Sequence, residues 1–222
     1  MKELLHEGWH SFTHTDKGIL KLIKDLTLHP KTVYLNYFNG QRKKYFSPVT
    51  FFLVTAAILI FVGIKVLDYE DYKLKMFNEF GRYILTYTKF ISLLLLPVQI
   101  LLTWLLFFRQ FNLAKNIVFW LFLNGLQFTF KILLSPLYFI FIEQKRFLDN
   151  GISILLTFLV FWHLVLLFGR RKWVNIMLCF LIANVIFIAG YLLSGYFIIG
   201  DDFMAKVHAR NIFELFLKAY QW

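Results

Sequence analysis

The stretch VTFFLVTAAILIFVGIKV, residues 49–66, decides the class of fold. No charged side chain occurs between Lys44 and Lys65. An α-helix rises about 1.5 Å per residue, so about 20 such residues cross the roughly 30 Å hydrocarbon core of a bilayer. The stretch therefore predicts a transmembrane helix over residues 49–66.

The rest of the chain has the same apolar character. Of its 222 residues, 59% are hydrophobic and 20% are aromatic, and the mean hydropathy is +0.62. A soluble domain of this size has too little interior for so much apolar surface. The sequence therefore predicts an all-α integral membrane protein in which residues 49–199 form a bundle of five transmembrane helices. The predicted spans are residues 49–66, 87–108, 117–142, 152–168 and 174–199.

Charge alternates between the six segments that lie outside these spans. The first, third and fifth segments contain thirteen Lys and Arg against four acidic residues, whereas the second, fourth and sixth contain eight against nine. Because cytoplasmic loops carry an excess of Lys and Arg, the N-terminus is expected in the cytoplasm and the C-terminus outside. This topology accounts for the net charge of +11, so no nucleic-acid partner is expected.

Residues 1–48 predict an amphipathic segment at the cytoplasmic membrane interface. Its first helix is expected to lie along the membrane surface, with lysines turned away from the apolar face. Pro30 predicts a break, and Gly40 predicts the end of a second, aromatic helix. Residues 200–222 predict another amphipathic helix, on the outer face. The apolar face of the first helix consists of Ile19, Leu22, Ile23 and Leu26.

The sequence QRKKYFSP, residues 41–48, suggests an anion-binding site just before the first span. Its candidate residues are consecutive: Arg42, Lys43, Lys44 and Tyr45. Ser47 and Pro48 are suited to cap and start a helix whose free N–H groups favour anions. Phosphate groups of anionic lipids are the expected ligands. The alternative is that these cations serve only as a topology signal.

The third predicted span carries a polar stripe. Asn124, Gln127 and Lys131 share one helix face, and Pro136 is expected to kink the helix. A lysine in hydrocarbon costs about 2.5–3.5 kcal/mol on insertion scales, so it should point into the bundle. With His163 on the fourth span, these residues form a candidate intramembrane site for an anionic group. Alternatively, Lys131 extends toward Glu143 at the outer membrane surface.

HEGWHSFTH, residues 6–14, contains the H-E-x-x-H spacing of zinc proteases. His6, His10 and His14 could share one helix face and bind a metal ion. Gly8 weakens such a helix, and no Asp or Glu within the predicted spans could complete a membrane-embedded protease site. We therefore expect interfacial histidines and no cofactor, with noncatalytic zinc binding as one alternative and a hydrolase using Glu7 as another.

The segment FTHTDKGILKLIKDLTLHPKTVYLNYFNGQRKKYFSPVTFFL, residues 12–53, resembles the signature region of a bacterial membrane-protein family known as domain of unknown function 3667. The resemblance implies a polytopic membrane protein and no established activity. Many relatives carry an N-terminal zinc ribbon of paired cysteines, whereas this sequence has a single cysteine. The residues that carry the resemblance are Asp16, Gly18, Pro30, Tyr37, Gly40, Arg42, Tyr45 and Pro48.

These observations favour a noncatalytic protein over an enzyme. The leading hypothesis is a multi-pass protein of the bacterial inner membrane that binds anionic lipid, acts as an accessory subunit of a membrane complex, or does both. One alternative is a transporter of lipids or small anions that uses Lys131. The other is a metal-dependent membrane hydrolase at His6, Glu7 and His10.

Overall fold

The structure is a computed structural model, and it describes residues 18–74, 95–169 and 172–186. Every regular element in these ranges is a helix. A helix over residues 18–28 comes first, and two further helices cover Leu95–Phe107 and Trp173–Ile186. The remaining elements are α2 (Pro30–Phe38), η1 (Arg42–Lys44), α3 (Pro48–Leu74), α5 (Leu113–Leu134), α6 (Pro136–Ile140), η2 (Ile142–Gln144) and α7 (Lys145–Phe168).

Three stretches are long and apolar enough to cross a membrane, which supports the predicted class of protein. They are Arg42–Val66, Leu113–Ile140 and Asn150–Phe168, and they correspond to the first, third and fourth predicted spans. The second and fifth predicted spans lie only partly within the described residues, where they form the shorter apolar helices Leu95–Phe107 and Trp173–Ile186. The total of five spans therefore stays a prediction.

Helix α2 begins and ends where the sequence predicted. Proline lacks a backbone N–H, and Pro30 accordingly occupies the first position of the helix. At the other end, Gly40 has a φ of 91°, in the left-handed region that favours glycine. The N–H of Gly40 donates to the carbonyl of Tyr37 at 3.2 Å, and that of Gln41 donates to the carbonyl of Asn36 at 3.0 Å. This pair of bonds is a Schellman motif, and it turns the chain toward η1.

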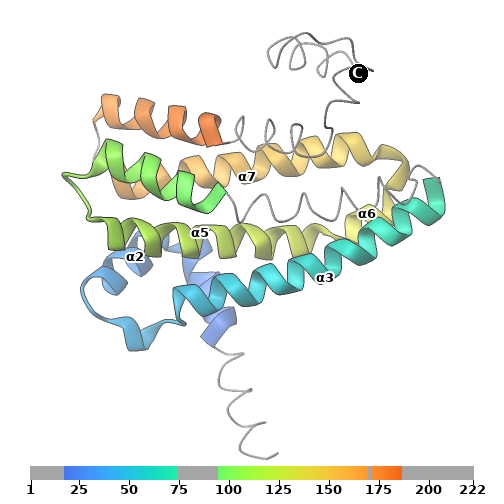
Figure 1. The fold of residues 1–222 in the computed structure, drawn as a ribbon, viewed down its shortest axis with the longest axis horizontal. Helices are drawn as coiled ribbons and strands as arrows, with labels where there is room; N and C mark the ends of the chain where they lie inside the picture. Colours follow the sequence, from blue (N-terminus) through green and yellow to red (C-terminus); the bar gives the residue numbers. More distant parts are fainter. Residues whose placement is uncertain (1–17, 75–94, 170–171, 187–222) are drawn as a thin grey trace, which may run out of the picture.

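Helix α5 lies between α3 and α7 (Figure 1). Its close approach to α3 depends on Gly125, because a Cβ at that position would meet the ring of Phe51 at 2.6 Å. One turn farther along, the rings of Phe52 and Phe128 pack with centroids 5.5 Å apart. Small and aromatic residues thus alternate across this helix pair, as is typical of helices packed within a membrane.

The predicted kink at Pro136 is confirmed. Helix α5 ends at Leu134, and α6 begins at Pro136, whose missing N–H interrupts the backbone ladder. The hydroxyl of Ser135 donates to the carbonyl of Ile132 at 2.7 Å. This bond satisfies a carbonyl near the break within the otherwise apolar span.

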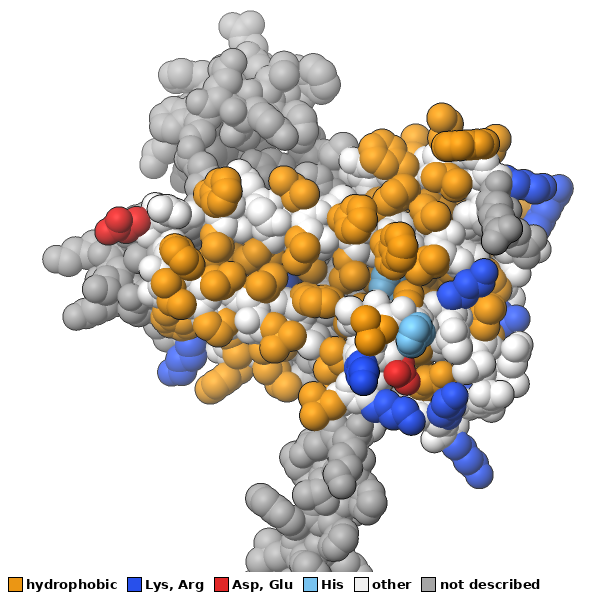
Figure 2. Space-filling view, turned by 180° about the vertical axis from the view of Figure 1, so that it is seen from behind, with side chains coloured by type: hydrophobic (Ala, Val, Ile, Leu, Met, Phe, Trp, Pro, Cys, Tyr) orange, Lys and Arg blue, Asp and Glu red, His pale blue; other side chains and the backbone are white. Residues whose placement is uncertain are grey.

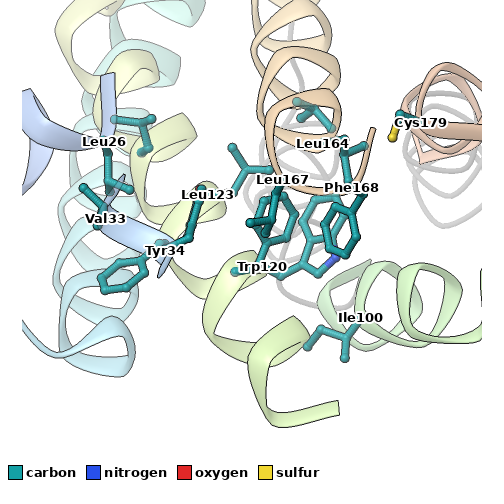
Figure 3. Close-up of a cluster of buried hydrophobic side chains, with 14 of the residues drawn as sticks. Leu26, Val33, Tyr34, Ile100, Trp120, Leu123, Leu164, Leu167, Phe168 and Cys179 are labelled. Carbon is teal, nitrogen blue, oxygen red and sulfur yellow. The ribbon is translucent and has the colours of Figure 1, made fainter. Parts of the chain in front are cut away.

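The amino-terminal helices are packed into the core of the bundle. Leu22 and Leu26 are 1% and 0% exposed, and Val33 and Tyr34 on α2 are each 1% exposed. Figure 3 shows Leu26, Val33 and Tyr34 entering from one side, toward Leu123 of α5. The apolar face that was expected to contact lipid therefore contacts protein. Burial against other side chains removes it from water as effectively as lipid does, so amphipathicity alone could not distinguish the two.

The described surface divides into an apolar body and a basic end. Hydrophobic side chains cover the length of the body, and most Lys and Arg gather toward one end (Figure 2). Exposed apolar residues of α3 include Leu53, Ile58 and Phe61. An apolar belt beside a basic end is the pattern expected where a bundle leaves the hydrocarbon core.

Candidate functional site

The candidate anion-binding residues form a turn between α2 and α3. Arg42, Lys43 and Lys44 make up η1, and all three side chains are exposed. Tyr45 follows in extended backbone and is half-buried. Three residues farther on, Pro48 begins α3 as predicted. The three cations therefore lie at the amino-terminal end of the first candidate span, just before α3.

Aromatic rings hold two of these cations in place. The guanidinium carbon of Arg42 lies 5.9 Å from the ring centroid of Tyr37, and Nζ of Lys44 lies 5.7 Å from that of Tyr45. Exposed cation–π contacts of this kind contribute about 0.5–1 kcal/mol. Among the described residues, no carboxylate forms an ion pair with these cations.

The turn is also tied to α2 by a hydrogen bond. Nδ2 of Asn36 donates to the hydroxyl of Tyr45 at 3.1 Å, and Asn36 is half-buried. This bond joins the middle of α2 to the residue that follows η1. The position of the cations consequently depends on the position of α2.

Two further cations adjoin this end of the bundle. Nζ of Lys115 lies 5.6 Å from the ring of Phe38 and 5.8 Å from the ring of Phe111, so it bridges α2 and the start of α5. The guanidinium carbon of Arg109 lies 5.6 Å from the ring of Phe108. Sequence reasoning used Arg109 and Lys115 only for topology. The signal it missed is the interleaving of cations with phenylalanines in FFRQFNLAK, residues 107–115.

His163 on α7 pairs with Tyr34 on α2. The Tyr34 hydroxyl lies 2.8 Å from Nδ1 of His163, and both side chains are buried. Burial raises the pKa of Tyr34 well above its usual 10.0, so the phenol stays protonated. The direction of the hydrogen bond depends on the imidazole tautomer: the phenol donates to Nδ1, or Nδ1–H donates to the phenol oxygen. Nε2 is buried and has no hydrogen-bond partner among the described residues.

The other members of the predicted intramembrane site lie apart from this pair. Nδ2 of Asn124 donates to Oε1 of Gln99 at 2.8 Å, which joins α5 to the helix Leu95–Phe107. Lys131 follows Asn124 by seven residues, about 10 Å along the helix, and is half-buried, as is Gln127. The structure thus brings Asn124 to Gln99 and His163 to Tyr34. The anionic ligand predicted for this site stays a prediction.

A second buried polar contact lies close to the Asn124 pair. Nε1 of Trp120 donates to the hydroxyl of Thr103 at 2.8 Å. The Thr103 hydroxyl in turn donates to the carbonyl of Gln99 at 2.8 Å. The Trp120 indole N–H and the Thr103 hydroxyl, both buried, thus each have a partner. These bonds hold the Leu95–Phe107 helix against α5. A ligand could contact these polar groups only if the bonds were first broken.

The predicted metal ligands His6, His10 and His14 lie outside the described residues, as does Glu7. Within residues 18–74, 95–169 and 172–186, no group of three or more His, Cys, Asp or Glu is arranged to hold a metal ion. The metal hypothesis for the N-terminus therefore stays a prediction.

Comparison with known proteins gives one match. Residues 16–60 match the family described as "Protein of unknown function (DUF3667)". This DUF3667-like segment covers 45 of the chain's 222 residues. The matched DUF3667 segment contains the two amino-terminal helices, η1 and the first half of α3, and so includes every residue of the candidate anion-binding turn. The chain matches no curated protein and no solved structure.

Proposed function

We propose that this protein is a noncatalytic, multi-pass protein of the bacterial inner membrane whose basic end binds the phosphate groups of anionic lipids. The observation that supports this most directly is the exposure of Arg42, Lys43 and Lys44 on a turn at the amino-terminal end of a candidate span. Cations at that level of a membrane protein lie beside lipid headgroups, where each contributes about 1 kcal/mol of attraction to an anionic surface.

Charge supports the cytoplasmic leaflet as the site of binding. Lys115 and Lys172 follow the connections at the same end of the bundle as η1, whereas Glu143 lies at the other end, in η2. With five spans, the positive-inside rule places the basic end and the N-terminus in the cytoplasm and the C-terminus outside. The anionic lipids of that leaflet are the complementary ligand.

Native mass spectrometry of protein released from nanodiscs tests this proposal. The nanodiscs contain equal amounts of phosphatidylglycerol and phosphatidylcholine, and the retained lipids are counted. Wild-type protein should retain phosphatidylglycerol in excess. The variant Arg42→Gln/Lys43→Gln/Lys44→Gln should lose most of that excess, because the attraction falls with each cation removed.

Lys65→Gln is the matched control, because Lys65 is an exposed cation near the other end of the same α3 helix. It should retain the wild-type excess. Equal retention by wild-type protein and the triple variant would contradict the proposal. A stoichiometric protein partner in place of lipid, lost in the triple variant, would instead assign the basic end to an accessory subunit.

A second candidate is a transporter of lipids or small anions. It is favoured by Lys131, a half-buried cation within the span Leu113–Ile140, one turn before the break at Ser135. A half-buried cation in such a place needs compensation. In proteoliposomes, Lys131→Met should abolish anion flux while the protein still elutes as a folded species. Full flux in this variant would rule out Lys131 as the transporting residue.

A further inference from the structure

Residues 18–47, here called the docked segment, meet the rest of the bundle mainly through apolar side chains. Leu22, Leu26 and Val33 are buried in the same hydrophobic cluster as Phe119 and Leu164. A buried side-chain hydrogen bond between Tyr34 and Nδ1 of His163 also joins the docked segment to α7. Apolar packing is non-directional, whereas a buried hydrogen bond fixes a position and an angle.

Three residues that follow Tyr34 on α2 each contact a residue of the basic end. Asn36 donates to the hydroxyl of Tyr45, Tyr37 carries Arg42 over its ring, and Phe38 carries Lys115 over its ring. These three residues follow Tyr34 within about one helical turn. A rotation or shift of α2 at Tyr34 would therefore displace several cations together.

We propose that His163 is a positioning residue for the lipid-binding turn. His163 fixes the position of Tyr34 relative to α7. Because Tyr34 lies on α2, this also fixes the position of α2 and, through it, of the cations Arg42, Lys44 and Lys115. This inference rests on the proposed lipid-binding function. It assigns a role in charge recognition to a side chain that is buried in the bundle and touches none of the exposed cations.

Packing alone does not account for a histidine at this position. The ring of His163 is 0% exposed, and its Nε2 has no hydrogen-bond partner. A leucine would remove the unpartnered Nε2, but it would leave the buried Tyr34 hydroxyl without its partner, which is costly in such surroundings. What leucine lacks is the hydrogen-bonding group that fixes Tyr34. The bond joins residues 129 positions apart in the sequence, so it aligns two elements that no local structure connects.

Four variants test the inference. His163→Leu and Tyr34→Phe each remove one partner of the hydrogen bond between these residues. His163→Asn is the conservative variant, because its Oδ1 can accept a hydrogen bond near the position of Nδ1. Thr103→Val is the matched control, because it removes a different buried bond, from Trp120 to Thr103, which lies between α5 and the Leu95–Phe107 helix.

Two properties are measured for each variant in nanodiscs: hydrogen exchange of the α2 amides and the phosphatidylglycerol excess. We expect His163→Leu and Tyr34→Phe to accelerate α2 exchange about tenfold, as expected for the loss of one buried hydrogen bond. Both should reduce the lipid excess about fivefold, as expected if one cation is displaced from the headgroups. His163→Asn should stay close to wild type, and Thr103→Val should change neither property.

The outcomes separate this inference from the function on which it rests. If the triple variant at residues 42–44 loses the lipid excess but His163→Leu keeps it, lipid binding stands and the positioning role is overturned. Unchanged α2 exchange in His163→Leu overturns it as well. An equal loss of lipid in Thr103→Val would show that general destabilisation is the cause, which also overturns it. If wild-type protein shows no lipid excess, the proposed function fails and the inference fails with it.

Discussion

The ring of Phe51 lies directly over the Cα of Gly125, so close that a Cβ added there would come within 2.6 Å of two ring atoms. This contact joins the first turn of α3 to the middle of α5. Phe51 is 0% exposed, and its ring also packs on that of Phe122 at 6.4 Å between centroids. The ring is thus held from two sides and has little room to move aside.

Replacing Gly125 with alanine should therefore destabilise the protein. The added methyl group must displace Phe51 or separate the helices, and such overpacking typically costs about 1–3 kcal/mol. Thermal unfolding in detergent, followed by circular dichroism, measures the effect. Gly151→Ala is the matched control, since nothing lies within 4 Å of its Cβ position and alanine favours a helix. It should leave the midpoint unchanged or raise it. A Gly125→Ala protein as stable as wild type would show that the two helices adjust freely.

Gly40 should tolerate asparagine better than alanine. Its φ of 91° is disfavoured for residues with a Cβ, and such strain costs on the order of 1–3 kcal/mol. Nothing lies within 4 Å of the Cβ position, so the cost would come from backbone conformation and not from a clash. We expect a lower unfolding midpoint for Gly40→Ala than for Gly40→Asn, because asparagine visits left-handed conformations more readily. Equal midpoints would mean that the turn can change its backbone conformation.

Alkaline pH should loosen the docked segment. The pKa of Tyr34 is raised above 10.0 when it is buried, so its contribution to docking is complete below about pH 10. As pH rises through and above 10, Tyr34 ionises more readily when the segment is undocked than when it is docked. The equilibrium between the two states therefore shifts toward the undocked one. The ultraviolet difference spectrum between wild type and Tyr34→Phe should contain a phenolate signal that titrates above the usual range. A signal centred at 10 would show that Tyr34 is accessible to water.

Asn124 and Gln99 should be energetically coupled. Replacing either residue with leucine leaves the other amide buried without its partner, and replacing both removes the unpaired groups. In a double-mutant cycle, the coupling should be about 0.6 kcal/mol, the average found for hydrogen bonds between membrane helices. Unfolding in mixed micelles by sodium dodecyl sulfate measures each variant. Strict additivity would indicate that the two amides find other partners in the wild-type protein.

Local signals in the sequence were sufficient for several helix ends and for the location of three apolar spans. Pro30, Gly40, Pro48 and Pro136 act through their own backbone chemistry, so their effects are independent of the rest of the fold. The length of an uncharged run is likewise a local property, and it located the three spans that the structure contains in full.

Contacts between side chains that are far apart in the sequence could not be predicted in the same way. His163 was grouped with Lys131 because both are polar residues in spans, yet it pairs with Tyr34, 129 positions away. The level of a side chain along its helix axis depends on how the helices are offset, and a single sequence contains no measure of that offset. The apolar face of residues 18–28 posed the same difficulty, since lipid and protein interior both favour apolar side chains.

The position of the docked segment affects the order in which native contacts can form during synthesis. The receptor surface of this segment includes His163 and Leu164, which emerge from the ribosome long after Tyr34. At about 5–20 residues per second, the 129 positions between Tyr34 and His163 correspond to a delay of roughly 6–26 s. During that interval α5 emerges and can cover part of the segment's buried face through Phe119 and Leu123, but the contacts with α7 cannot yet form. The docked segment thus completes its native contacts only after α7 has been synthesised.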